Sequence, residues 1–332
     1  MWGAGLTRSA VVAALVVVGI LLAPVGRARA DSLPGTSSGA RSGVPPAAAT
    51  VPRRQLLVVG RVSRRAMVHQ PRLEALADWL APRLAHVGIR AGAAVIARTP
   101  EDMIELLRRG RVDVISDSVL SLLRYEEKAG AQPLMLEWRN GQSHDQTVFF
   151  TARTAQIFSL RDLVGRRVAL EDRSSTTGFM MPLSAMIAAG LKPVALATAE
   201  APVSAGRVGY VFGHSEANIS AWVASGVVDV GAFSVRDWEN KRTNPVQYRE
   251  KMRLFYMSSP LLRSILAVRS GLDGVLKAAL VQALRDFATD GEAEAMRASY
   301  YRVSQFTPLT GRVAQDLEEA RRIYRRIRPL LD

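Results

Sequence analysis

The strongest constraint on the fold is a regular alternation of short β-branched runs with stretches that have helical spacing. It starts with "QLLVVGRV" at residues 55–62, followed by a helical pattern at 70–89 and a second strand pattern at 90–98. Thr99 then caps a helix whose end leads directly into a strand at 112–116. Strands that alternate with helices in this way form a sheet covered by helices, so the chain is predicted to be α/β.

The same alternation recurs further along the chain, from a strand pattern at 146–153 to another at 227–234. The two halves share a phrase, "LLRRGRVDVISDS" and "WVASGVVDVGAFS". In each, a helix ends on Gly, Val-Asp-Val opens a buried strand, and small polar residues follow. A basic C-terminal helix has an apolar face that predicts packing on the core.

The first 30 residues have the features of an export signal. Arg8 precedes an apolar run from Ala10 to Val25, and the segment closes on the small-x-small sequence Ala28-Arg29-Ala30. The alternative is an uncleaved membrane anchor, because the run is close to the lower limit for a span. Residues 31–54 are rich in Pro, Gly, Ser and Ala and are predicted to be a disordered linker.

Composition narrows the classes of function. The chain has no cysteine, so an exported form has neither disulfides nor the N-terminal cysteine of a lipoprotein, and it must depend on a large core. The formal net charge is +14, or +11 without the first 30 residues, which carry three arginines and no acid. A basic surface favours anionic ligands, although a genomic preference for arginine gives the same excess. The basic residues are scattered along the sequence, so no nucleic-acid partner is expected.

A run of hydroxyl residues, Ser174, Ser175, Thr176 and Thr177, precedes Gly178 and an apolar helical stretch. One side chain is enough to cap a helix, so the additional hydroxyls need another explanation. A helix start exposes unpaired N–H groups and carries a partial positive charge, and it therefore binds anions. The run predicts an anion site in which the glycine lets the anion approach the backbone. The alternative is a redundant cap or a flexible loop.

Small polar residues also follow the two Val-Asp-Val strands. They are Ser116, Asp117 and Ser118 in the first half and Ser234 in the second. Ligands of open α/β sheets collect outside the carboxyl ends of strands, so these side chains are candidates for ligand contacts. Turn chemistry after a strand explains them equally well.

Catalytic and metal-binding constellations are not evident. His214 and Glu216 would suit a general acid and base acting on a phosphoester, but no activated nucleophile, metal cluster or nucleotide-binding glycine loop accompanies them. His69, His86 and His144 lack the spacing of metal ligands and are interpreted as surface residues. We therefore expect a binding protein with no metal and no cofactor, and not an enzyme.

Several segments, taken in order, resemble the phosphonate-type periplasmic binding proteins, the substrate-binding components of phosphate/phosphite/phosphonate ABC importers. The most specific is "EDRSSTTGFMMP", similar to the family's Asp-x-x-Ser-Thr-Ser-Gly segment before an apolar helix. "GHSEANISAWVASGVVDVGAF" resembles the family's Ser-His-Glu-Ala segment, with the order His214-Ser215-Glu216 in this chain. "LRDLVGR" and "SSPLL" are similar to two shorter segments. The resemblance extends from residue 55 to about residue 310.

The resemblance implies a type II periplasmic binding protein fold, with two lobes, each a mixed sheet flanked by helices, and a ligand cleft between them. Lobe 1 is expected at residues 55–145 plus 258–332 and lobe 2 at 146–257, joined by two crossing strands. The resemblance also implies a monomeric periplasmic protein that binds a phosphonate, phosphite or phosphate and delivers it to an ABC permease. The alternative is a sensor domain of the same fold that serves a signalling receptor.

Carried over residue by residue, the resemblance names the anion donors. They are Ser175, Thr176, Thr177, the N–H of Gly178, and His214. Family members that bind aminoalkyl phosphonates place a carboxylate shortly after the Ser-Pro-Leu turn, where this chain has Arg263, which is expected to meet a second anionic group. Only Asp117 remains as an acid that could hold an ammonium. We therefore expect 2-aminoethylphosphonate to bind no better than a ligand without an ammonium group.

Overall fold

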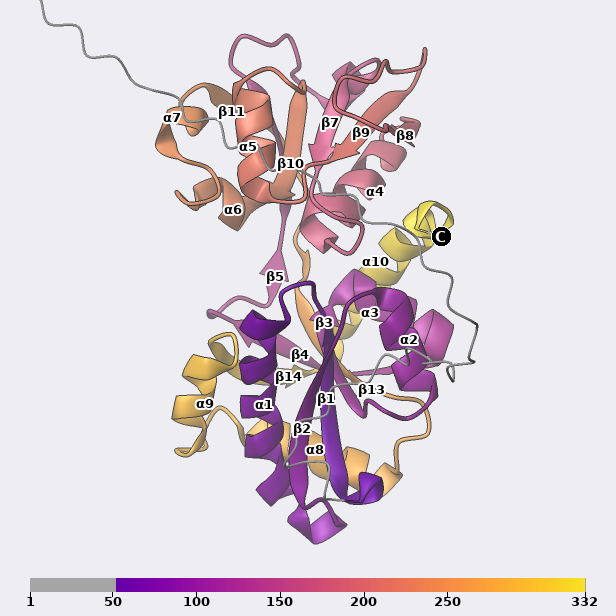
Figure 1. Ribbon diagram of the computed structural model, residues 1–332, viewed down its shortest axis with the longest axis vertical. Helices are drawn as coiled ribbons and strands as arrows, with labels where there is room; N and C mark the ends of the chain where they lie inside the picture. Colours follow the sequence, from indigo (N-terminus) through magenta and orange to yellow (C-terminus); the bar gives the residue numbers. More distant parts are fainter. Residues whose placement is uncertain (1–51, 332) are drawn as a thin grey trace, which may run out of the picture. The chain divides into compact units, whose positions relative to one another are not determined.

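The computed structural model describes residues 52–331, which contain two six-stranded sheets flanked by helices (Figure 1). The expected signal peptide at 1–30 and most of the expected linker at 31–54 lie outside the described residues. No helix within residues 52–331 is long and apolar enough to cross a membrane.

The first sheet has the strand order β14-β4-β13-β3-β1-β2, with β1 parallel to both β2 and β3. Its antiparallel strands β13 and β14 come from the far end of the chain. The strands are β1 (Leu56–Val62), β2 (Ala91–Ala97), β3 (Val114–Ser118), β4 (Gln132–Arg139), β13 (Ser264–Val268) and β14 (Val303–Pro308). The helices between them are α1 (Ala66–Arg83), α2 (Pro100–Arg108), α3 (Val119–Ala129), α8 (Gly274–Asp286) and α9 (Ala293–Ser299).

The second sheet has the order β11-β6-β10-β7-β9-β8, in which β10, β7 and β9 are parallel neighbours. The strands are β6 (Thr147–Ala152), β7 (Arg167–Leu170), β8 (Pro193–Ala195), β9 (Val208–Phe212), β10 (Val230–Ser234) and β11 (Met252–Met257). The helical elements are a π-helical turn, η5 (Thr176–Met180), and α4 (Met181–Ala188), α5 (Glu216–Ala224), α6 (Val235–Glu239) and α7 (Val246–Arg249). Parallel order brings the carboxyl ends of the three central strands to one edge of this sheet.

A small antiparallel pair lies between the two sheets along the chain. The chain passes from β4 to β6 through β5 (His144–Asp145), and it returns from β11 to β13 through β12 (Leu261–Leu262), which pairs with β5. All strands of the first sheet fall within 56–139 and 264–308, and all strands of the second within 147–257.

The phrase shared by the two halves has a structural explanation. The carboxylate of Asp113 accepts a hydrogen bond from the backbone N–H of Val58 on the neighbouring strand, at 3.0 Å. Asp229 does the same for the N–H of Arg167, at 2.8 Å. In both sheets the aspartate of Val-Asp-Val therefore ties the start of its own strand to an adjacent parallel strand.

The C-terminal helix α10 (Gly311–Ile327) packs on the core, as its sequence pattern predicts. Its buried face consists of Leu317, Ala320, Tyr324 and Ile327. The helix contacts α3, beside the first sheet, and α4, beside the second. Arg321 forms an ion pair with Glu126 of α3 at 2.9 Å, and Arg326 donates to Ser184 Oγ of α4 at 3.0 Å.

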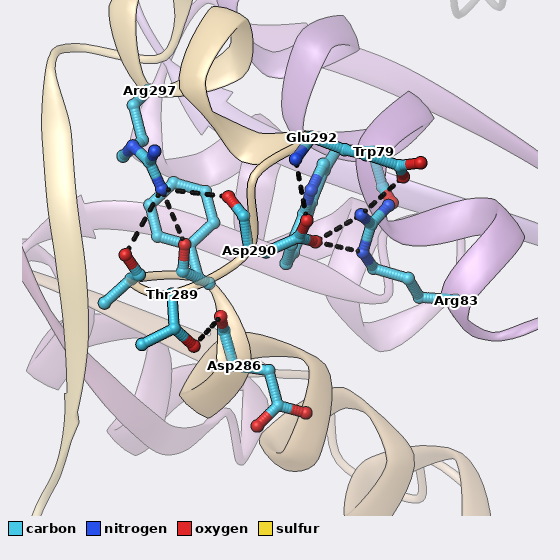
Figure 2. A network of polar contacts seen from close by, with 9 residues as sticks. Trp79, Arg83, Asp286, Thr289, Asp290, Glu292 and Arg297 are labelled. Carbon is cyan, nitrogen blue, oxygen red and sulfur yellow. Dashed lines mark hydrogen bonds and ion pairs between the residues drawn. The ribbon is translucent and has the colours of Figure 1, made fainter.

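A polar network fixes the segment between α8 and α9 to the end of α1 (Figure 2). The Arg83 guanidinium donates to Asp290 Oδ2 at 2.9 Å, and it also donates to the carbonyl of Trp79 and lies over that indole ring. Arg297 donates to the carbonyl of Phe287 at 2.9 Å and to that of Asp290 at 3.2 Å. These bonds hold α9, and with it the loop that follows α9, against α1.

Candidate anion-binding site

Three helical segments start at the carboxyl ends of β7, β9 and β10, and a serine caps each one. Ser175 Oγ accepts from the N–H of Gly178 at 2.9 Å. Ser215 Oγ accepts from Asn218 at 3.2 Å at the start of α5, and Ser234 Oγ accepts from Asp237 at 3.1 Å at the start of α6. Because helix starts carry partial positive charge, this edge of the second sheet favours an anion.

The hydroxyl run lies at this edge, in the turn that leads into α4. The sequence predicts an ordinary helix start here, whereas the structure has a π-helical turn, a rare form that is frequent at functional sites. The hydroxyl of Thr176 is buried and has no hydrogen-bond partner among residues 52–331. The carbonyl of Thr177 accepts from Thr147 Oγ1 at 2.7 Å, which fixes the turn to β6. A buried hydroxyl without a partner is costly, so a ligand acceptor would complete it.

Gly178 has a packing role in the structure. A Cβ at this position would lie 2.6 Å from Glu171 Cβ and 2.7 Å from Glu171 Oε2, so the space that the sequence analysis reserves for an approaching anion is occupied by Glu171. The N–H of Gly178 is also taken by Ser175 Oγ. Its role as an anion donor stays a prediction, and it requires Ser175 to release that N–H.

Three carboxylates lie at the same edge: Glu171 after β7, Glu216 at the start of α5 and Asp237 in α6. Burial and the neighbouring Glu216 raise the pKa of Glu171 to about 7. Burial also raises the pKa of Asp237, and Glu216 adds to this, although a hydrogen bond from Ser234 acts in the opposite direction. The sequence gives no sign of this cluster, because Glu171, Glu216 and Asp237 follow three different strands and only the order β10-β7-β9 brings them together. At neutral pH a half-protonated Glu171 can donate a hydrogen bond to an oxyanion.

The raised pKa of Glu171 predicts that stability falls with increasing pH. The folded state holds the proton more tightly than the unfolded state, in which the carboxyl has its ordinary pKa of 4.5. The contribution is fully present below pH 4.5 and is lost as pH rises through about 7, by at most about 3 kcal/mol in the free energy of unfolding. Urea unfolding of wild type and Glu171→Gln between pH 5 and 8 measures it.

We expect wild type to lose stability relative to Glu171→Gln as the pH rises from 5 to 8, because the variant has no carboxyl group to ionise at this position. Glu200→Gln, an exposed acid of the same part of the chain, is the control and should follow wild type at every pH. Parallel curves for wild type and Glu171→Gln would contradict the assignment.

His214 lies next to this edge but bonds to an acid. Its backbone has a φ of 59°, its side chain is exposed, and its Nδ1 is 2.8 Å from Asp172 Oδ1. If Nδ1 carries the proton shared with Asp172, Nε2 donates to an anion only when the ring is protonated. The role of His214 as an anion donor stays a prediction with that condition.

The start of α3 provides contacts from the first sheet. Ser118 Oγ bonds to Ser121 Oγ at 3.0 Å, and Ser121 Oγ donates to the carbonyl of Ser174 at 3.4 Å. Asp117 is nearly buried, and its two oxygens accept from the N–H of Ser118 at 2.7 Å and from Tyr125 Oη at 3.2 Å. Burial raises the pKa of Asp117, an effect that Arg61 partly offsets. The structure thus links Ser118, through Ser121, to the hydroxyl run. The partners of Asp117 lie in β3 and in the helix that follows it, α3.

The other predicted contacts have internal partners. Ser116 is fully buried and accepts from Arg139 Nη2 at 2.8 Å, and Ser234, also buried, bonds to the carboxylate of Asp237. Arg263 donates to the carbonyl of Arg139 at 3.1 Å and lies 3.9 Å from Asp145. Ser116 and Arg263 therefore belong to a group around Arg139, and Ser234 belongs to the cap of α6. As ligand contacts, all three stay predictions.

Two of the histidines interpreted as surface residues are partly buried in the structure, which corrects that interpretation. His69 Nδ1 is 2.7 Å from Tyr301 Oη, and burial together with Arg61 lowers the pKa of His69 to about 4. His144 lies between Ser143 and Asp316, while His86 is exposed. No group of three His, Asp or Glu side chains in the described part of the chain is placed to hold a metal ion.

Comparison with known proteins identifies the family. The family model for the periplasmic substrate-binding protein of phosphonate ABC transporters matches residues 63–313. The chain belongs to this family. XAC2383 from Xanthomonas citri, solved bound to a chloride ion, is 31% identical to this phosphonate-type binding protein over 83% of this chain and 99% of the other, with a TM-score of 0.79.

Two further structures are informative. XAC2383 has also been solved bound to ATP, with 31% identity over 83% of this chain and 98% of that one and a TM-score of 0.78. PhnD1 from Prochlorococcus marinus, in complex with methylphosphonate, is 17% identical over 82% of this chain and 99% of its own length, with a TM-score of 0.59. The fold is therefore that of the type II periplasmic binding proteins, as the sequence analysis predicts, and the family is a periplasmic one.

Proposed function

We propose that this phosphonate-type binding protein captures a small phosphorus oxyanion at the hydroxyl run and delivers it to an ABC permease. The observation that carries the proposal is the buried, unpartnered hydroxyl of Thr176 in a turn that opens a helix. The methylphosphonate bound to PhnD1 and the ATP bound to XAC2383 support a ligand with a phosphonate or phosphate group.

Binding would use fixed hydrogen-bond donors and no chemical step. Thr176 and Thr177 offer hydroxyls, the start of α4 offers its dipole, and protonated Glu171 offers an O–H. Ser118 and Ser121, at the start of α3, approach the run from the first sheet. A ligand held from both sides would favour a closed arrangement of the two lobes.

A thermal-shift screen tests the proposal with phosphate, phosphite, methylphosphonate, sulfate and ATP. A ligand at about a hundred times its Kd adds roughly 2.7 kcal/mol to the free energy of unfolding. For a protein of this size that corresponds to an increase of about 4–5 °C in Tm. We expect at least one phosphorus anion to reach this range and sulfate to remain below it, and no response to any of the phosphorus anions would disprove the proposal.

The carboxylate cluster changes the expectation for a ligand with an ammonium tail. From the sequence, Asp117 is the acid expected to hold such a group, yet in the structure Glu216 and Asp237 lie near each other and near Glu171. An ammonium placed among them would gain charge-assisted hydrogen bonds and relieve their mutual repulsion.

We therefore expect 2-aminoethylphosphonate to bind at least as tightly as methylphosphonate in calorimetry, in contrast to the sequence-based expectation. The substitution Glu216→Gln should weaken the aminophosphonate about tenfold or more and leave methylphosphonate nearly unchanged. Asp117→Asn is the matched variant that tests whether Asp117 holds the ammonium group. If Asp117→Asn removes the preference and Glu216→Gln does not, Asp117 is the ammonium partner.

A further inference from the structure

A polar pocket is formed by residues of α1, the end of β4, the segment before β13, the end of α9 and the loop after it, and no residue of the hydroxyl run lines it. Its volume is about 320 Å³. Four arginines contribute to its wall, and Asn140 and Tyr301 are among the other lining residues. The arginines are Arg72, Arg139, Arg263 and Arg302. No carboxylate lines this pocket.

Tyr301 organises the arginines. The guanidinium carbons of Arg61, Arg72 and Arg139 lie 5.2, 5.1 and 4.4 Å from the centre of its ring. The Tyr301 hydroxyl is bonded to His69, which is neutral at pH 7 because its pKa is about 4. One aromatic ring therefore holds three cations by cation–π contacts without neutralising any of them.

The positive charge around the pocket is only partly balanced. Arg139 donates to Glu137 Oε2 at 2.7 Å, and the other oxygen of Glu137 accepts from Tyr300 at 2.6 Å, so this carboxylate is fully used. Arg263 is 3.9 Å from Asp145, which also pairs with Arg236 at 2.5 Å. Burial lowers the pKa of Arg263 to about 10, and the neighbouring Arg236 and Arg139 add to this effect.

Arg72 and Arg302 are the two pocket arginines that form no ion pair with an acidic side chain of the described residues. Within residues 52–331, the side chains of Arg72 and Arg302 have no hydrogen-bond or ion-pair partner. Like charges held this close repel, and an anion among them would remove that cost. Guanidinium groups bind phosphate through paired N–H donors, which makes them suited to a ligand with several phosphoryl oxygens.

The backbone at the pocket is also unusual. Asn140, Tyr301 and Arg302 have φ values of 52°, 50° and 51°, in the left-handed region that side-chain-bearing residues rarely adopt. The N–H of Asn140 donates to the carbonyl of Arg302 at 2.9 Å, which joins the two strained segments. The network of Arg83 and Arg297 fixes the adjacent helix (Figure 2). Strained backbone held by its surroundings is concentrated at ligand sites.

We propose that this arginine pocket is a second anion site, separate from the hydroxyl run, and that it binds a multiply charged phosphate compound. The excess of guanidinium groups over carboxylates and the polar lining point to a ligand with more than one phosphoryl group. Inorganic pyrophosphate is the simplest probe of this class.

Calorimetry with pyrophosphate at constant ionic strength, on the full chain, tests the proposal, because non-specific attraction to a basic surface is screened by salt. The double variant Arg72→Gln/Arg302→Gln should weaken pyrophosphate binding at least tenfold and leave methylphosphonate binding unchanged. Arg90→Gln/Arg98→Gln removes the same charge from exposed positions and is the control, which should bind pyrophosphate as wild type does. Thr177→Asp, which disables the hydroxyl run, should also retain pyrophosphate binding.

Three outcomes would overturn the proposal. Loss of pyrophosphate binding in Thr177→Asp would mean that one site takes both ligands, and equal loss in the two double variants would mean that only net charge matters. Absence of binding to wild type would exclude the ligand class. Ser299→Glu places a carboxylate at the pocket from an exposed position, and it should weaken pyrophosphate even if the arginine variants fold poorly. Failure of the hydroxyl-run proposal would instead appear as unchanged methylphosphonate affinity in Thr177→Asp.

Discussion

Thr177→Asp is expected to lower the affinity for methylphosphonate by about a hundredfold or more while the protein stays folded. Thr177 is half-buried in the turn before α4. A carboxylate there would repel the ligand by roughly 4 kcal/mol if the charges are about 4 Å apart in a partly screened environment. It would also take the place of a hydroxyl donor.

Calorimetry of three variants separates charge from hydrogen bonding. Thr177→Val removes only the hydroxyl and should cost about tenfold in affinity. Thr198→Asp adds the same charge at an exposed position near the same sheet and should bind as wild type does. If Thr177→Asp unfolds at the same temperature as wild type and binds methylphosphonate equally well, the anion lies elsewhere.

Local signals predicted some elements closely. Thr99, Pro100 and the acids after them predicted a capped helix, and the structure has α2 starting at Pro100 with Thr99 and Asp102 in a capping box. The hydroxyl run was likewise located correctly at the carboxyl end of a strand, before an apolar helix. In these cases the interactions that decide the structure lie within a few residues of one another.

Long-range pairing explains the errors. The sequence pattern predicts a strand at 112–116, whereas β3 is Val114–Ser118, because Asp117 and Ser118 pair with Ile265 and Ser264 of β13. No local pattern shows that a strand far along the chain extends this pairing.

Which charged residues lie close together depends even more on long-range structure. The basic residues are scattered in the sequence, yet Arg72, Arg139, Arg263 and Arg302 meet at one pocket. The acids of the carboxylate cluster also follow three different strands. The interaction between two charged groups depends on the distance between them in space, and the order of the strands in the sheet sets that distance. The residue types therefore indicate an anion site, but they do not show which acids lie beside it.

The ion pair at the base of the arginine pocket is expected to contribute strongly to stability. Glu137 is fully buried and Arg139 is 5% exposed, and Arg61 and Arg72 lie against the same ring as Arg139. Glu137→Gln would leave a buried guanidinium without its counter-charge, and we expect the free energy of unfolding to fall by about 3–5 kcal/mol. Guanidinium-induced unfolding of the full chain measures this change.

Two controls show whether the loss comes from the buried charge. Glu105→Gln breaks an exposed ion pair with Arg109 on α2 and should cost no more than about 0.5 kcal/mol. The double variant Glu137→Gln/Arg139→Met removes both charges and should recover much of the stability lost in Glu137→Gln, since the unpaired cation is then absent. If Glu137→Gln is as stable as Glu105→Gln, the buried ion pair does not contribute strongly to stability. If the double variant regains stability but no longer binds pyrophosphate, the buried ion pair serves the binding pocket and lowers the stability of the fold relative to an apolar pair.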